Sequence, residues 1–95
     1  MSTLERAIRL INDFCLKEYD SEADISDLSK VDLAYTVLED NDECEIQVSA
    51  NLVDFGLYTY VDGKLYSETK YDSLEDLVHS ELETLDFDTL VSLND

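Results

Sequence analysis

The stretch from Cys44 to Leu52 constrains the fold most, because it is the clearest alternation of apolar and polar side chains in the sequence. The apolar residues, at every second position, are Cys44, Ile46, Val48, Ala50 and Leu52. Side chains of a strand point alternately to its two faces, so this period of two predicts a strand with one buried and one wet face. Such a strand belongs to an antiparallel sheet that is covered on one side.

Three further segments predict the rest of the sheet. In residues 31–37 the side chains expected on one face are Val31, Leu33, Tyr35 and Val37. In residues 54–61 they are Phe55, Leu57, Thr59 and Val61, with Tyr58 and Tyr60 on the other face. Asp62-Gly63 then predicts a type I′ hairpin, which needs positive φ at both positions, and residues 65–71 form the returning strand. The short connections predict a four-stranded antiparallel β-meander.

Helices are expected at both ends of the chain. The residues that recur at helical spacing near the N-terminus are Leu4, Ala7, Ile8, Ile11, Phe14 and Cys15. Ser2 and Glu5 match a capping box in front of them. After the N-cap residue Ser73, the apolar residues of the C-terminal helix are Leu74, Leu77, Val78 and Leu82. The apolar pattern continues less regularly after Leu82, and a second short helix is one interpretation of it. Residues 1–95 are therefore expected to form a single compact α+β domain.

Glu81 breaks the pattern of this last helix, because it falls within the apolar arc. One interpretation is that the helix bends or ends near Glu81, so that the carboxylate reaches the rim. The other is a half-buried carboxylate that accepts a hydrogen bond from a tyrosine or the backbone, or is offered to a basic partner. Buried charges are rare unless they are paired, which favours the first interpretation.

The net charge of −18, from 24 acidic and 6 basic residues, limits the classes of partner. DNA, RNA and anionic membranes all require a positive surface, so the charge argues against them and favours a basic partner or none. The acidic residues are concentrated in two blocks, 20–45 and 72–95. The excess exceeds the charge of about 2–8 that suffices for the solubility of a small domain.

Known catalytic and metal motifs do not fit the sequence. A loop starting at Asp20 lacks the glycine and the glutamate of a calcium-binding EF-hand, and one starting at Asp40 has Cys44 in place of the third ligand. A single histidine, His79, and two widely spaced cysteines do not make a zinc set. Cys15 and Cys44 both fall on expected apolar faces, so neither is a good candidate nucleophile. We expect no cofactor, no metal and no enzymatic activity.

The start of the sequence, MSTLERAIRL, lacks the apolar core of a signal peptide, and no run of residues is long and apolar enough to span a membrane. Two cysteines fit a reducing compartment, and a Cys15–Cys44 disulfide is the alternative. These features predict a cytoplasmic protein.

Three stretches resemble a known family: LINDFCLKEYDSEADISDLSKVDLAYT, ECEIQVSANLVDFGLYTYVDG and YDSLEDLVHSELETLDFDTLV. They are similar to small acidic accessory proteins and domains of mobile genetic elements in Gram-positive gut bacteria, some of them joined to large polyvalent proteins. The resemblance implies a setting in element transfer or defence evasion. It implies no catalytic residues.

Two hypotheses about function remain. In the first, the chain is an acidic interaction module, with nucleic-acid mimicry toward a basic DNA-handling protein as its sharpest form. Its candidate residues are Asp40, Asp42, Glu43, Glu75, Asp76 and Glu83. In the second, it is a scaffold or oligomerisation domain that uses an aromatic sheet face, and the charge serves only solubility. That face would carry Tyr58, Tyr60 and Tyr66, opposite Phe55, Leu57 and Leu65. The sequence does not fix the oligomeric state.

Overall fold

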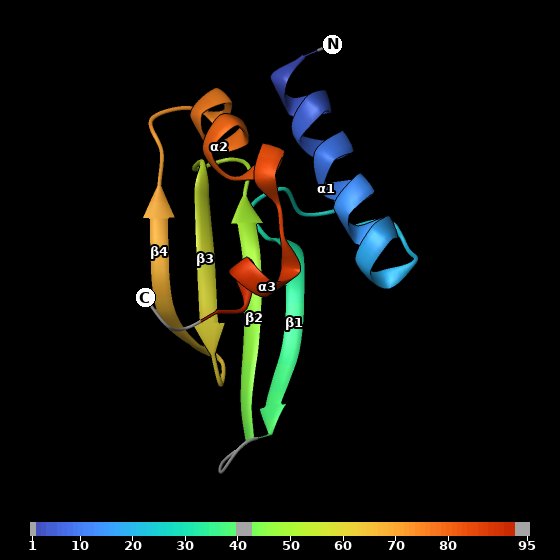
Figure 1. Ribbon diagram of the computed structural model, residues 1–95. Helices are drawn as coiled ribbons and strands as arrows, with labels where there is room; N and C mark the ends of the chain where they lie inside the picture. The colour runs from blue at the N-terminus through green and yellow to red at the C-terminus, as the bar shows by residue number, and fades with distance from the viewer. Residues whose placement is uncertain (1, 40–42, 93–95) are drawn as a thin grey trace.

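A computed structural model describes residues 2–39 and 43–92, which form an α+β fold of two layers. In chain order the longer elements are α1 (Thr3–Tyr19), β1 (Val31–Glu39), β2 (Glu43–Asn51), β3 (Gly56–Val61), β4 (Lys64–Lys70) and α2 (Leu74–Ser80). A 3-10 turn, η1 (Leu82–Thr84), and a short helix, α3 (Phe87–Leu90), follow. The predicted fold class, an N-terminal helix, a four-stranded antiparallel meander and a C-terminal helix, is confirmed (Figure 1).

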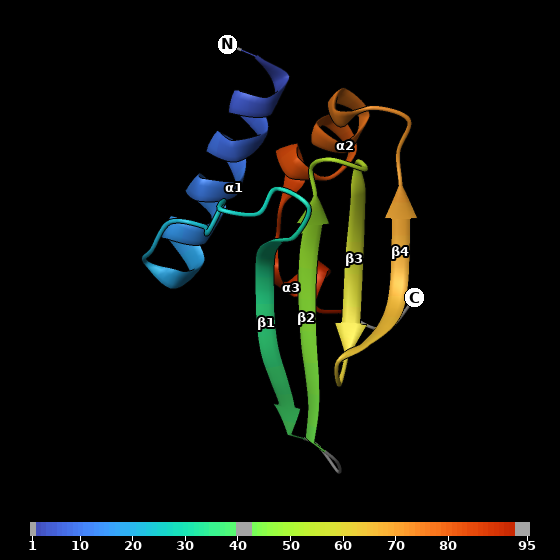
Figure 2. The same cartoon turned by 180° about the vertical axis from the view of Figure 1, so that it is seen from behind.

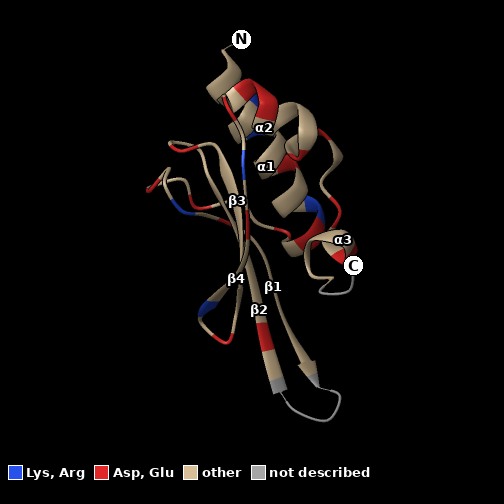
Figure 3. Ribbon diagram, turned by 90° about the vertical axis from the view of Figure 1, so that its left-hand side faces the viewer, with Lys and Arg blue, Asp and Glu red and all other residues tan. Residues whose placement is uncertain are grey.

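The helices cover one face of the sheet, and within the described parts of the chain no second layer covers the other face. The strands lie in the order β1-β2-β3-β4, each antiparallel to its neighbour. Seen edge-on in Figure 3, α1, α2 and α3 all lie on the same side of the sheet. Figure 2 views the molecule from the opposite side, where the strands face the viewer. We call this uncovered side the open face.

The core forms where α1 and α2 meet the covered side of β1 and β2. Ser2 caps α1 through the expected capping box, its hydroxyl accepting from the Glu5 N–H while the Glu5 carboxylate accepts from the Ser2 N–H. The fully buried large side chains are Ile11, Leu33, Ile46, Leu77, Leu82, Val31, Val48 and Val78. They come from both ends of the chain and from the first two strands, so the two terminal helices share one core with the sheet.

A β-bulge in β1 overturns part of the predicted alternation. Asp32 pairs with Ser49, but Ala34 pairs with Val48, so Leu33 is an extra residue in the ladder. Leu33 and Ala34 are consequently both buried. Beyond the bulge the alternation changes phase, and Tyr35, at 52% exposure, lies on the open face and not with Leu33. The prediction that Tyr35 and Val37 share the buried side of β1 is therefore wrong.

A second irregularity shifts the pairing of β3 with β4. The Asp62-Gly63 hairpin forms as predicted, with φ of 53° and 80°. Thr59 pairs with Ser67 and Tyr60 with Leu65, which leaves Tyr66 as the extra residue. Leu65 thus shares the face of Tyr60, whereas the plain alternation placed it on the opposite side.

The third strand also begins later than its sequence suggests. It starts at Gly56, because Phe55 has a φ of 63° and belongs to the preceding turn. The side chain of Asn51 organises this turn, accepting from the N–H groups of Val53 and Asp54 at 2.8 Å each. These short-range hydrogen bonds compete with extension of the strand.

Replacing neighbouring residues by asparagine tests the bulge in β1. Ala34→Asn puts an amide into the core at a position that is 2% exposed, and we expect it to lower the free energy of unfolding by about 2–4 kcal/mol. Tyr35→Asn places the same amide on the open face and should cost no more than about 1 kcal/mol. Urea denaturation of both variants measures the difference. The opposite order would mean that β1 follows the unbroken alternation.

Candidate functional site

Tyrosine and aliphatic side chains gather on the open face, from every strand except β2. Cross-strand pairing puts Tyr58 opposite Ser49 and Tyr60 opposite Gln47, which in turn faces Tyr35. Tyr66 at the edge is 55% exposed, and its neighbour Leu65 is 52% exposed. Aromatic side chains on an uncovered sheet face are typical of surfaces that bind a partner.

Two local contacts set the positions of the central tyrosines. The Tyr58 ring packs against Gly56, where an added Cβ would stand 2.8 Å from its Cε2 atom. A glycine at this position lets the ring lie flat against the sheet, as aromatic side chains do over glycines in other strands. The ammonium of Lys30 lies 5.6 Å from the centre of the Tyr60 ring, within the range of a cation–π interaction.

Carboxylates are interleaved with these rings. Asp32 accepts a hydrogen bond of 2.9 Å from the Gln47 side chain. Burial raises the pKa of the Tyr35 hydroxyl, and the nearby Glu45 carboxylate, to which this hydroxyl is hydrogen-bonded, raises it further. Between Asp32 and Tyr58, Ser49 is 2% exposed and its Oγ is the one buried side-chain oxygen without a partner among the described residues.

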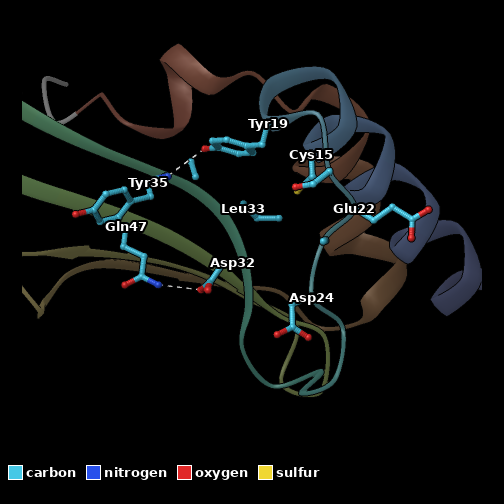
Figure 4. A pocket seen from close by; sticks show the side chains of 11 residues that line it. Cys15, Tyr19, Glu22, Asp24, Asp32, Leu33, Tyr35 and Gln47 are labelled. Carbon is cyan, nitrogen blue, oxygen red and sulfur yellow. Dashed lines mark hydrogen bonds between the residues drawn. The ribbon is translucent and has the colours of Figure 1, made fainter.

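A pocket of ≈ 330 Å³ opens at the edge of the sheet beside the β1 bulge. Its lining comes from the end of α1, from residues 21–24 and from the bulged part of β1 with Gln47. Figure 4 shows Asp32 and Leu33 on the strand, Asp24 on the loop, and Cys15 and Tyr19 on the helix around this space. The Tyr19 hydroxyl accepts from the Tyr35 N–H at 3.1 Å and so satisfies one donor of the edge strand.

Burial makes Cys15 a poor candidate for a nucleophile. Both Cys15 and Cys44 are free, and burial together with the Asp32 charge raises the pKa of the Cys15 thiol. A raised pKa keeps the sulfur protonated and unreactive at neutral pH. Across residues 2–39 and 43–92, no three metal-ligating side chains are grouped to hold an ion, and no helix is long and apolar enough to cross a membrane.

Of the acidic residues predicted to bind a partner, the structure describes the side chains of Glu75, Asp76 and Glu83, all in the C-terminal helical segment. Glu75 and Asp76 are exposed in the first turn of α2, in the helical layer. Glu83 forms an ion pair with Arg6 and contacts His79 Nδ1 at 3.1 Å, so its charge stabilises the contact between the two ends of the chain. Asp40 and Asp42 lie outside the described residues, and Glu43 is described only as the strand partner of Glu39.

The sequence placed Tyr58 and Tyr60 correctly on one face but did not indicate Tyr35 or Lys30, and the strand pairing does not fix the face of Tyr66. Tyr35 reaches the open face only because of the bulge, which alternation cannot reveal. Lys30 is the one basic residue in the acidic block 20–45, and its position next to the first strand was the available signal.

Both interpretations of Glu81 hold in part: the helix ends just before it, and its carboxylate is half-buried and hydrogen-bonded to a tyrosine. Helix α2 ends at Ser80, and Glu81 follows as its C-cap residue. The carboxylate is half-buried and accepts a hydrogen bond from the Tyr71 hydroxyl. Burial raises its pKa, and the hydrogen bond from Tyr71 opposes part of that rise.

The raised pKa of Glu81 gives stability a definite pH dependence. Its contribution is complete below the unfolded pKa of about 4.5 and is lost as the pH rises through the higher folded pKa. Glu81→Gln keeps an acceptor for Tyr71 but cannot ionise. Between about pH 4 and about pH 7, we expect this variant to gain up to about 1 kcal/mol over wild type in urea denaturation. Glu68→Gln, at an exposed carboxylate on β4, is the control, and an equal gain there would contradict a specific role of Glu81.

Comparison with known proteins assigns no relative to the chain. No family model matches it, no curated protein is significantly similar in sequence, and no solved structure matches its fold significantly. The candidate site therefore rests on the open face and the adjoining pocket as the structure presents them.

Proposed function

We propose that this protein is a non-enzymatic acidic interaction module that binds a basic protein segment on the open face of its sheet. The observation that carries the proposal is the Lys30 ammonium over the Tyr60 ring, beside carboxylates of the same face. A lysine of the chain itself thus occupies the kind of place that a lysine or arginine of a partner would take.

The open face offers a basic partner two kinds of attraction. Faces of tyrosine rings attract cations, by about 0.5–1 kcal/mol at exposed sites. Asp32, Glu45 and Glu68 supply negative charge on the same side of the sheet, since their cross-strand partners are Ser49, Val37 and Tyr58. The overall charge of −18 adds long-range attraction that speeds the encounter with a basic partner.

Charge in the helical layer makes the protein acidic on both sides. Glu75, Asp76 and Asp88 belong to α2 and α3, on the covered side of the sheet (Figure 3). A basic groove that encloses the domain would meet carboxylates on each wall. The DNA-binding groove of a basic DNA-handling protein is one example. For such a partner, the domain would act as a mimic of nucleic acid.

Self-association through the same tyrosine face is the second candidate function. The exposure of Leu65 and Tyr66 favours self-association. Electrostatic repulsion opposes it, because each of the two copies carries a net charge of −18. Sedimentation equilibrium at physiological salt should therefore show a monomer. A dimer that dissociates on Tyr66→Asp would establish the self-association function instead.

Binding of a fluorescein-labelled octalysine peptide, followed by anisotropy, tests the proposed function. We expect the Kd to rise steeply from about 0.05 M to about 0.5 M salt, because exposed charge pairs are screened. Glu68→Gln on the open face should weaken binding more than Glu75→Gln in the helical layer, although both remove one charge. Absence of binding at low salt would refute the proposal.

A second matched pair of variants locates the cation site. Lys30→Gln removes the ammonium from the Tyr60 ring. Lys17→Gln makes the same change of charge at an exposed position of α1. Both should tighten octalysine binding, and Lys30→Gln should do so by roughly a further two- to fivefold, the equivalent of one exposed cation–π contact. Equal effects of the two variants would place the peptide elsewhere on the protein.

A further inference from the structure

We propose that the pocket beside the β1 bulge receives one arginine side chain of the basic partner. This inference rests on the proposed function, and it names the residue type that gives the interaction its specificity. The pocket and the open face are continuous, because Asp32, Tyr35 and Gln47 belong to both. A segment lying on the open face can therefore direct one side chain over the edge of β1.

The size and walls of the pocket suit a single long side chain. Its ≈ 330 Å³ is at the low end of the range of about 300–1,000 Å³ for small-molecule sites. Leu33, Ala34 and the Tyr19 ring give it apolar walls for the methylenes of such a side chain. Long basic side chains bury their stems in this way while the charged group stays near polar atoms.

The polar atoms around the pocket are mainly acceptors, and they come from the strands and from the loop. Asp32 uses Oδ1 to accept from the Gln47 side chain, so its Oδ2 is the carboxylate oxygen that a guest can use. Asp24 lines the same pocket from the loop (Figure 4). Hydrogen bonds from Ser26 lower the pKa of Asp24 and so keep it ionised. The field of Asp32 reaches the inner wall, where it helps to raise the pKa of Cys15.

This distribution of acceptors favours arginine over lysine. A guanidinium carries five N–H donors in one plane and can bind acceptors of the loop and of the strand together, whereas an ammonium is a compact, strongly hydrated point charge. Hydrogen bonds to charged groups are also the stronger ones. A metal ion is a weaker fit, because the carboxylates of the described residues do not converge into a set of three ligands.

Comparison of labelled octaarginine and octalysine peptides on the full chain tests the pocket. We expect wild type to bind octaarginine on the order of fivefold more tightly than octalysine. Asp32→Asn should reduce this ratio, while its side chain can still accept from Gln47. Ala23→Leu fills the pocket without changing charge and should bring the ratio close to one. Glu68→Gln, outside the pocket, should weaken both peptides and leave the ratio unchanged.

The outcomes separate this inference from the proposed function. Octalysine binding that persists in Ala23→Leu shows that the variant is folded and that the open face is intact. If both peptides bind but neither pocket variant lowers the ratio, the arginine pocket is wrong and the basic-partner proposal stands. If wild type binds neither peptide at low salt, both proposals fail.

Discussion

The bulge at Leu33 is the constraint on which the rest of the structure depends. The bulge places both Leu33 and Ala34 in the core, where they pack between β1 and the helices. The same extra residue turns Tyr35 outward and opens the pocket beside Asp32. Bulges occur preferentially near sites where a side chain must be redirected. In this domain one inserted residue serves the core and the candidate binding face at once.

The distribution of charge follows from a sheet that is covered on one side only. Carboxylates cannot enter the core, so they are divided between the helical surface and the open face. The few basic residues hold specific positions: Arg6 pairs with Glu83 across the two ends of the chain, and Lys30 lies over Tyr60. Within residues 2–39 and 43–92, Glu83 is the carboxylate that forms ion pairs, so most of the described negative charge faces solvent.

Elements with a local cause were predictable from the sequence. The capping box of α1, the alternation of β2 and the Asp62-Gly63 hairpin each depend on a few neighbouring residues, and each forms as expected. The two bulges were not predictable, because they depend on which residue of a partner strand lies opposite. The alternation therefore placed Tyr58 and Tyr60 on the correct face of the sheet. It placed Tyr35 and Leu65, which lie next to the bulges, on the wrong face. The pocket joins residues from three segments and leaves no periodic signal at all.

The contact between the two ends of the chain has a consequence for synthesis. Helix α1 packs against α2 and η1, whose Leu77, Val78 and Leu82 complete the core around Ile11. During synthesis α1 therefore leaves the ribosome well before α2 and η1, the residues that cover its apolar side. The meander, whose pairings all join sequence neighbours, can form in the meantime, since local contacts form fastest. During that interval the carboxylates of the acidic block 20–45 are already exposed, and they repel those of neighbouring nascent chains while the apolar side of α1 is uncovered.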